Sequence, residues 1–335
     1  MQVELYIATL DGGKTKTVCA VLDTKGNVLS FASGGATGVS LLDSRAVEIN
    51  LRNVVFDALE RSGLTVGDIG LASFTVCDLD TEELKEGMKR AVLKLGFKGR
   101  VLLEPDYVGA YYLATHGRPG VAVIAGTGSI AYGEDGHGKK ARAGGWGWLM
   151  GDEGSGIWIG TRALNTVTRA HDGTGEETSL LKMVCKEFDI KDCLDLLNIV
   201  YRNGRPDVAL ASRVSPLVSR AAEEGDAQAI RILQQAGHEL GLVGLTVSRK
   251  LGLEGTYEVG CVGSVFKSNI VLNAFKQACR SESKSVKFRG PYTDYLPLLG
   301  PAVMAFKSLQ KRSSSEEIFE TIAKNLKNVS HQLRN

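Results

Sequence analysis

At 335 residues the chain is long enough to form two α/β domains, each with a hydrophobic core of its own. Hydrophobic residues make up 43% and charged residues 23% of the chain, which excludes a disordered or fibrous protein. The 40 basic residues nearly balance the 38 acidic ones and are scattered along the chain, so we expect a small-molecule ligand and no nucleic acid.

The chain begins with three short apolar segments that are joined by turns. Residues 5–10, 18–23 and 28–32 are predicted strands, and the loop between the first two starts at Asp11. Neither a basic leader with a cleavage site nor an apolar span long enough for a bilayer is visible, so we expect a cytoplasmic protein without a membrane partner. The pattern predicts a β-meander whose first hairpin has a glycine-containing tip.

The next segment alternates helical and extended patterns. Residues 44–62 carry apolar side chains at the spacing of one helix face, and residues 81–95 form a second predicted amphipathic helix. Short apolar strands are predicted at 69–76 and 101–103, and Asp106 follows the second of them. This strand, helix, strand order predicts parallel strands in one sheet.

The meander pattern returns in the second part of the chain. Strands are predicted at residues 121–125, 130–134 and 139–143, helices near 154–171, 178–188, 207–223 and 226–251, and a further strand at 257–262. A capping box at Ser314 and Glu317 predicts a last helix over residues 315–334. We expect one domain over 1–115 and another over 116–314, with the last helix as a candidate to pack back on the first domain.

The two glycine-rich hairpin tips, at residues 12–17 and 126–129, are the strongest functional signal. A hairpin closes with a single Asn-Gly or Asp-Gly pair, whereas these tips add Thr and Ser hydroxyls to glycines whose backbone N–H groups can approach an anion. Neither tip matches the P-loop or the dinucleotide-binding fingerprint. Their duplication therefore predicts a pair of phosphate-binding loops, one in each domain.

A series of motifs follows in chain order: DGGKTKT at 11–17, Asp106 after a strand, GTGS at 126–129, GGWG and GDEGSG within 144–156, and GCVGSVFKS at 260–268. This series resembles the N-acetylglucosamine kinases and the wider group of BadF/BadG/BcrA/BcrD-type ATPases of the hexokinase, Hsp70 and actin superfamily. The resemblance spans most of the chain. It implies an α/β protein with two ribonuclease H-like (actin-like ATPase) domains, mixed sheets flanked by helices, and a ligand cleft between the domains.

The resemblance also implies an ATP-dependent sugar kinase that uses Mg²⁺ and forms a homodimer. Asp11, at the end of the first strand, would hold the Mg²⁺, and the adenine of ATP would lie near residues 260–266. The residues expected to bind ATP are Gly12, Gly13, Lys14, Thr15, Lys16, Thr127, Gly128, Ser129, Gly260, Gly263 and Ser264.

Asp106 is the expected general base of this kinase. It lies where a strand ends and an apolar helix begins, and a carboxylate there can accept the proton of an attacking hydroxyl. From the residues alone, a helix cap is the alternative role. The residues expected to contact the sugar are Thr37, Asp106, Gly145, Trp146, Gly147, Asp152 and Glu153.

Two positions depart from the family pattern. Lys14 replaces the third glycine of DGGGT, and its ammonium could contact a γ-phosphate or face water. The sugar-binding asparagine of the family is absent from residues 34–40, where Thr37 and Ser40 are the candidates to replace it. The acceptor therefore stays open among N-acetylglucosamine, glucose and related sugars, and 2-keto-3-deoxygluconate, a sugar acid, is an alternative.

Two other classes of function are compatible with the implied fold. An activator of 2-hydroxyacyl-CoA dehydratases would need cysteines near the nucleotide loops to hold an iron–sulfur cluster, but Ala125 precedes the second tip and residues 151–156 contain no cysteine. A sugar sensor would lack a general base, and a chaperone-like ATPase would need a peptide-binding domain after the adenine segment. We therefore favour the kinase.

Overall fold

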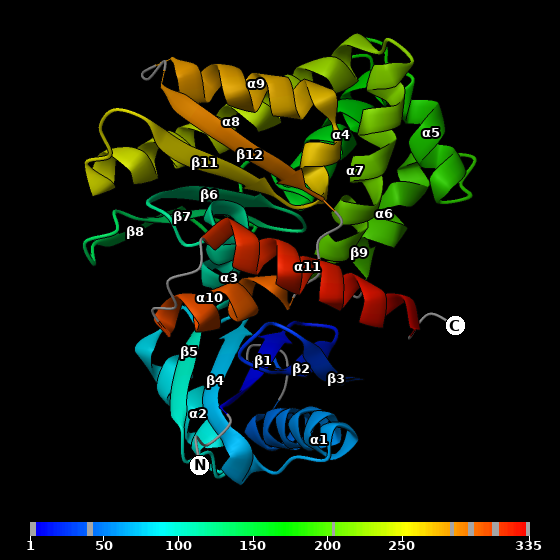
Figure 1. Cartoon of the computed structure of the whole chain (residues 1–335). Helices are drawn as coiled ribbons and strands as arrows, with labels where there is room; N and C mark the ends of the chain where they lie inside the picture. Colours follow the sequence, from blue (N-terminus) through cyan, green and yellow to red (C-terminus); the bar gives the residue numbers. More distant parts are fainter. Residues whose placement is uncertain are drawn as a thin grey trace. The chain divides into compact units, whose positions relative to one another are not determined.

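The computed structural model describes residues 5–38, 43–202, 205–281, 285–293, 298–309 and 315–332 (Figure 1). Contacts divide the chain into two compact units. Unit 1 comprises Met1–Arg118 and Tyr295–Asn335, and unit 2 comprises Pro119–Asp294.

Unit 1 is built on a mixed five-stranded sheet with the order β3-β2-β1-β4-β5. The strands are β1 (Tyr6–Gly12), β2 (Thr17–Leu22), β3 (Val28–Gly34), β4 (Ile69–Val76) and β5 (Arg100–Pro105). The first three form an antiparallel meander, while β4 and β5 run parallel to β1, as the sequence predicts. The C-terminal ends of β1, β4 and β5 therefore lie along one edge of the sheet.

Helix α1 (Ser44–Ser62) has the bounds that its apolar spacing predicts. The carboxylate of Asp43 accepts a 2.8 Å hydrogen bond from the backbone N–H of Ala46, and Gly63 ends the helix in the left-handed conformation. Its apolar face, which includes Leu51 and Val55, is buried against β2 and β3. Unit 1 also contains η1 (Val66–Asp68), α2 (Glu82–Leu93), α3 (Asp106–Thr115), α10 (Leu299–Ser308) and α11 (Ser315–Gln332).

Helix α10 corrects the expected domain bounds, because residues 295–314 were expected in the second domain and the contacts place this helix in unit 1. It packs on α3 and β4, and the hydroxyl of Ser73 donates a 2.7 Å hydrogen bond to the carbonyl of Pro301. The helix is apolar and buried over most of its length, so it needs a core around it. The following α11 lies on α10 and β3; the predicted cap Ser314 and residues 333–334 lie outside the described residues.

Unit 2 repeats the sheet of unit 1, as the duplicated meander indicates. Its five-stranded sheet has the order β12-β11-β6-β7-β8, with an antiparallel meander followed by two parallel strands. The strands are β6 (Gly120–Ala125), β7 (Ser129–Glu134), β8 (Lys140–Gly144), β11 (Tyr257–Val262) and β12 (Val286–Tyr292). The predicted pair of mixed α/β sheets is confirmed.

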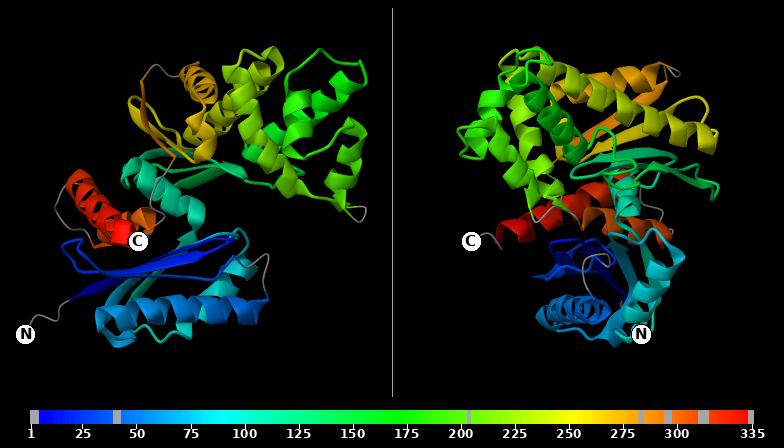
Figure 2. Two further views of the ribbon diagram at one scale, coloured as in Figure 1. Left: turned by 90° about the vertical axis from the view of Figure 1, so that its right-hand side faces the viewer. Right: turned by 180° about the vertical axis from the view of Figure 1, so that it is seen from behind.

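The helices of unit 2 form two groups. The long α8 (Ala227–Leu251) packs against β6, β7, β8 and α9 (Asn269–Arg280) (Figure 1). A helical region at one end of the unit contains α4 (Gly156–His171), α5 (Leu180–Glu187), α6 (Leu196–Val200) and α7 (Val208–Glu223) (Figure 2). Short elements complete the unit: η2 (Cys193–Asp195), β9 (Tyr201–Arg202), β10 (Arg205–Pro206) and η3 (Ser264–Lys267). Of these elements, α6, α9, β9, β10, β12 and η2 were not predicted.

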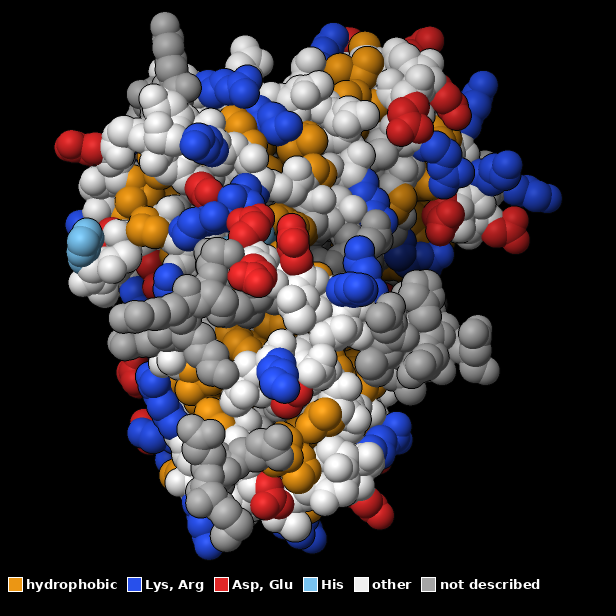
Figure 3. All heavy atoms as spheres, viewed as in Figure 1, with side chains coloured by type: hydrophobic (Ala, Val, Ile, Leu, Met, Phe, Trp, Pro, Cys, Tyr) orange, Lys and Arg blue, Asp and Glu red, His pale blue; other side chains and the backbone are white. Residues whose placement is uncertain are grey.

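The surface of unit 2 is basic around β12, which is an edge strand of its sheet. Figure 3 shows Lys and Arg side chains over α9 and β12, and Lys287 on the edge strand β12 is exposed. Charged side chains on an edge strand oppose its pairing with another sheet.

Within the described part of the chain, no helix has both the length and the apolar character needed to span a bilayer.

Candidate active site

The first predicted phosphate loop is the hairpin between β1 and β2. The N–H of Gly13 donates a 3.0 Å hydrogen bond to the carbonyl of Lys16, which closes the turn. The side chains of residues 14–16 are exposed. The base of the hairpin is fixed, because the carbonyl of Gly12 accepts a 2.9 Å hydrogen bond from the N–H of Cys77. Residues 14–16 are therefore exposed on a hairpin whose base is tied to the segment after β4.

Thr37 does not fit the predicted role of a sugar contact. Its side chain is fully buried, and its hydroxyl lies 2.9 Å from the hydroxyl of Thr17. A Cβ at position 12 would be only 2.3 Å from the Thr37 hydroxyl oxygen, so this close approach requires Gly12. Thr37 therefore supports the base of the first tip, and Ser40, the other candidate to replace the asparagine, lies outside the described residues.

Asp11 is the second-last residue of β1 and lies in a partly buried position. In the parallel register, Thr75 of β4 is opposite Asp11 of β1 and Glu104 of β5. The hydroxyl of Thr75 donates a 3.2 Å hydrogen bond to Oδ1 of Asp11. Burial and, after it, the nearby charge of Asp106 raise the pKa of Asp11 to about 7. The structure thus brings Asp11 and Asp106 to the same edge of one sheet.

Asp106 is the first residue of α3 and directly follows β5. Pro105 occupies the capping position of this helix, so the alternative role of Asp106 as the cap is not seen. The residue is exposed to solvent, although enough protein lies around its carboxylate to disfavour the charge. Burial raises the pKa of Asp106 to about 6, and the charges of Asp78 and Asp80 add to the rise. An accessible carboxylate with a raised pKa is suited to proton transfer.

Lys14 is held by an ion pair. Its ammonium lies 3.0 Å from Oδ1 of Asp78, which follows β4. Burial disfavours the charged form of Lys14, but the hydrogen bond and charge of Asp78 outweigh this effect and raise the pKa of the lysine. No sequence motif singles out Asp78, although it follows β4 at the sheet edge where Asp106 follows β5. This shared position at the C-terminal end of a parallel strand could have identified Asp78 from the sequence.

The second predicted phosphate loop joins β6 and β7 and is tied to the start of α4. The N–H groups of Gly156 and Ile157 donate hydrogen bonds of 2.8 and 3.3 Å to the carbonyls of Gly126 and Thr127. The hydroxyl of Ser129 donates a 2.8 Å hydrogen bond to the carbonyl of Glu153. Because this hydroxyl already has an acceptor, Ser129 positions the loop, and the exposed Thr127 and the backbone of the tip remain for a phosphate.

The segment between β8 and α4 contains the predicted sugar contacts of unit 2. Gly145 and Gly147 adopt positive φ angles of 69° and 80°, and Asp152 adopts φ 58°, which is uncommon for a residue other than glycine. The carboxylate of Asp152 is buried against the second tip, since a Cβ on Gly128 would lie 2.8 Å from its Oδ2. Trp146 is 62% exposed. The structure therefore brings Asp152 and Glu153 to the tip and leaves Trp146 accessible.

The predicted adenine segment separates into buried and accessible residues. Gly260 is buried within β11, which pairs with β6 and β12 on its two sides, and Phe266 is 1% exposed in the core of unit 2. Gly263 lies beyond the strand with φ 110°, and Ser264 is exposed at the start of η3. A contact between ATP and the buried Gly260 is therefore not supported, whereas Gly263 and Ser264 remain candidates.

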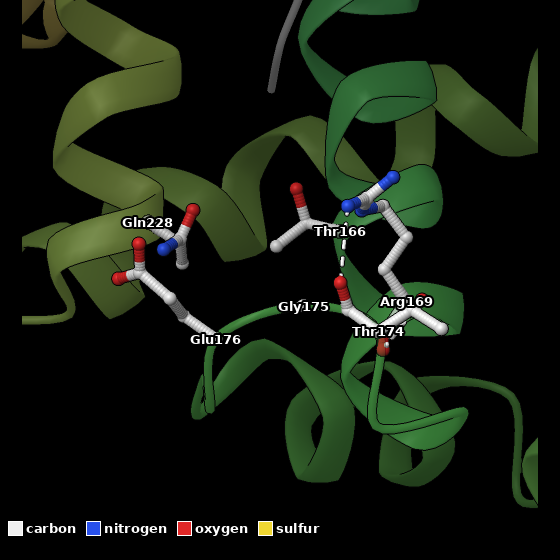
Figure 4. Close-up of a pocket in the computed structure, with 6 residues that line it drawn as sticks. All are labelled: Thr166, Arg169, Thr174, Gly175, Glu176 and Gln228. Atoms are coloured by element: carbon white, nitrogen blue, oxygen red, sulfur yellow. Dashed lines mark hydrogen bonds between the residues drawn. The ribbon is translucent and has the colours of Figure 1, made fainter.

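A shallow hollow in the helical region is a separate feature (Figure 4). It is lined by Thr166, Arg169, Thr174, Gly175, Glu176 and Gln228. The guanidinium of Arg169 donates a 3.0 Å hydrogen bond to the carbonyl of Thr174, and Glu176 pairs with Arg231 at 2.8 Å. None of the predicted site residues lines this hollow, and its charged groups bond to neighbouring protein groups. We assign it no role in the reaction.

The residues at the first tip fit a magnesium ion to which the protein supplies few ligands and to which water and phosphate oxygens supply the rest. Mg²⁺ is commonly bound through one or two carboxylates, while water and substrate phosphates complete its shell. Asp11 supplies one partly buried carboxylate beside an exposed loop. Among the described residues, no group of three or more His, Cys, Asp or Glu side chains forms an all-protein metal site. Phosphate oxygens would have to complete the shell.

Known proteins match this chain over most of its length. The kinase for N-acetylmuramic acid and N-acetylglucosamine from Clostridium acetobutylicum is 31% identical over 235 residues, which cover 70% of this chain and 76% of the relative. The N-acetyl-D-glucosamine kinase of Dictyostelium discoideum is 28% identical over 323 residues, which cover 92% and 99% of the two chains.

A solved structure shows the same fold. The protein from Chromobacterium violaceum, provisionally assigned as an N-acetylglucosamine kinase, superposes with a TM-score of 0.72 at 24% identity and covers 91% of this chain and 99% of its own. The BadF/BadG/BcrA/BcrD ATPase family matches residues 10–305. The predicted membership is therefore confirmed, and the chain belongs to the BadF/BadG/BcrA/BcrD ATPase family.

Proposed function

We propose that this protein is an ATP-dependent kinase that transfers the γ-phosphoryl group of ATP to a hydroxyl of N-acetylglucosamine, glucose or a related sugar. The observation that carries the proposal is the sheet edge of unit 1, where the accessible carboxylate of Asp106 lies near Asp11 and its glycine-containing hairpin tip. The names of the curated relatives, which are kinases of amino sugars, support the choice of acceptor.

Asp106 acts as the general base in this proposal. With a pKa of about 6, its carboxylate is ionised at neutral pH and can accept a proton. The sugar oxygen attacks the γ-phosphorus, the bond between that phosphorus and the β–γ bridging oxygen breaks, and ADP leaves with the bonding electrons. The proton of the sugar hydroxyl passes to Asp106. Because the transition state is loose, positioning and charge matter more than a strong base.

The two hairpin tips hold the phosphates in this proposal. Residues 14–16 are exposed and include two cationic side chains, and residues 126–129 form a loop fixed to α4. Bound at Asp11, Mg²⁺ would offset the negative charge of the β- and γ-phosphate oxygens. Gly263 and Ser264 would lie on the nucleoside side. A cleft between the two units that brings these groups together is part of the proposal.

The sugar would be held by the segment between β8 and α4. The exposed ring of Trp146 offers a flat apolar surface, and Asp152 and Glu153 offer acceptors for sugar hydroxyls. The homodimer implied by the family resemblance also belongs to this proposal.

Release of ADP tests the function. The protein is incubated with MgATP and, one at a time, N-acetylglucosamine, glucose, N-acetylmannosamine, glucosamine and 2-keto-3-deoxygluconate, and ADP is measured with a coupled assay. We expect at least one amino sugar or glucose to raise ADP release roughly tenfold or more, with a product heavier by one phosphoryl group. Turnover only with 2-keto-3-deoxygluconate would move the acceptor to the sugar acids. Equal ADP release with and without every sugar would contradict the kinase.

A further inference from the structure

Lys14 stands at the tip of the first hairpin with its backbone and its side chain both held. The carbonyl of Gly13 accepts hydrogen bonds of 3.2 Å from the N–H groups of Thr37 and Gly38. A Cβ on Gly38 would lie 3.3 Å from Cα of Lys14, so the two backbones are in close contact. At the other end of the side chain, the ammonium bonds to Asp78 at 3.0 Å, although the side chain is 56% exposed. Both ends of this exposed side chain are therefore held.

Asp78 is itself held firmly. Its side chain is 16% exposed, and its backbone adopts φ 64°. The preceding residue, Cys77, donates its backbone N–H to the carbonyl of Gly12 at 2.9 Å, which ties the end of β4 to the base of the hairpin. The Lys14–Asp78 pair therefore joins the hairpin tip to the segment that follows β4.

We propose that Asp78 is a positioning residue, which holds the Lys14 ammonium beside the phosphate site so that it can bind the terminal phosphate of ATP. This inference rests on the proposed kinase function. An ammonium has three N–H donors, and the bond to Asp78 uses one of them. The remaining donors can meet phosphate oxygens, and the ion pair lowers the conformational entropy that a long exposed side chain would lose on binding.

Replacement of Asp78 changes nucleotide affinity in opposite directions, depending on whether Asp78 positions Lys14 or acts only through its charge. Asp78 carries a negative charge near a site for a polyanion, so by charge alone its removal would tighten nucleotide binding. If Asp78 positions Lys14, its removal weakens the binding of a nucleotide that has a γ-phosphate. Asn accepts the left-handed backbone that Asp78 adopts, so Asp78→Asn changes the charge without straining the chain.

The experiment measures affinity by isothermal titration calorimetry with Mg²⁺ and the non-hydrolysable analogue AMPPNP, and in parallel with MgADP. The variants are Asp78→Asn, Asp78→Glu, Lys14→Ala and the double variant. Asp80→Asn is the matched control, because Asp80 is a nearby carboxylate that also acts on Asp106. Thermal unfolding of each variant and its affinity for MgADP check that the fold is intact.

We expect Lys14→Ala to weaken AMPPNP binding roughly tenfold and Asp78→Asn roughly threefold to tenfold, the range for a charge-assisted contact. The double variant should be no weaker than Lys14→Ala, Asp78→Glu should restore part of the affinity, and Asp80→Asn should leave it unchanged or tighter. MgADP affinity should change less than AMPPNP affinity in every variant.

Three results would overturn the inference. In the first, Asp78→Asn binds AMPPNP as tightly as the wild type or more tightly. In the second, the losses from Asp78→Asn and Lys14→Ala add in full in the double variant. In the third, Asp78→Asn weakens MgADP as much as AMPPNP. Each of these leaves the kinase function standing if the wild type binds AMPPNP, whereas a wild type that binds no nucleotide overturns both proposals.

Discussion

At the scale of single residues, two carboxyl groups are held in surroundings that disfavour their charge. Burial raises the pKa of Asp11 to about 7 and that of Asp106 to about 6, and each lies at the same sheet edge. Groups of this kind cost stability at neutral pH and are retained where they serve a reaction. The protein therefore carries an energetic cost at the place where we assign its chemistry.

This cost has a definite pH dependence. In the folded chain Asp106 binds its proton more tightly than in the unfolded chain, where its pKa is near the ordinary 3.8. The contribution of Asp106 to the free energy of unfolding is therefore fully present below pH 3.8. It is lost as pH rises through about 6. We expect Asp106→Asn to raise the midpoint of thermal unfolding at pH 8, and the gain to shrink as pH falls towards 4.

A capping residue provides the control for this prediction. Asp43 is exposed at the start of α1, and Asn caps a helix as well as Asp does. Asp43→Asn should therefore give no gain that disappears between pH 8 and pH 4. Equal gains for Asp106→Asn at both pH values, or no gain at pH 8, would show that the environment of Asp106 does not disfavour its charge.

At the scale of elements, helix packing in unit 2 depends on a glycine. A Cβ on Gly160 of α4 would lie 1.7 Å from the carbonyl oxygen of Ala211 in α7, so the two helices touch backbone to backbone. Gly87 in α2 is the matched position, because its nearest neighbour would be 3.9 Å away. We expect Gly160→Ala to destabilise the protein by about 2 kcal/mol or more, since the helices must separate.

The matched variant should act in the opposite direction. Gly87→Ala removes the conformational freedom of an unfolded glycine without a clash, so it should stabilise the protein by about 0.5 to 1 kcal/mol. Thermal and urea unfolding of both variants measure the difference. A Gly160→Ala variant as stable as the wild type would mean that α4 and α7 do not pack as closely as the structure shows.

The elements also show what could be predicted from the sequence. Helix α1 has a single apolar stripe, an Asp before it and a Gly after it, so both of its ends were predictable. Helix α10 is buried over most of its length, and therefore lacks the polar face that marks a surface helix. Strand β12 carries Lys287 and Arg289 at a sheet edge, which hides the apolar run of a strand.

The candidate site likewise contains residues that could be predicted from the sequence and residues that could not. Asp11, Asp106 and the two tips belong to local motifs that were predictable from order and residue type. The burial of Thr37 and of Gly260, and the pairing of Lys14 with Asp78, depend on contacts between segments that are far apart in the sequence. No local pattern encodes such contacts, so only the folded structure supplies them.

At the scale of the whole molecule, the chain consists of one sheet plan used twice. The orders β3-β2-β1-β4-β5 and β12-β11-β6-β7-β8 correspond strand by strand, and each first hairpin carries a glycine-containing tip. The first copy adds carboxylates at its sheet edge, and the second adds the segment with Trp146, Asp152 and Glu153. In the proposed reaction both copies act on one ATP and one sugar.

In the proposed reaction Asp106 takes the proton of a sugar hydroxyl during phosphoryl transfer, and the kinetics of Asp106→Asn measure this role. We expect this variant to bind AMPPNP and the best sugar acceptor within about threefold of the wild type, while kcat falls roughly 10²- to 10⁴-fold. Asp43→Asn should retain its kcat. An Asp106→Asn enzyme that keeps its sugar-dependent kcat would show that Asp106 is not the general base.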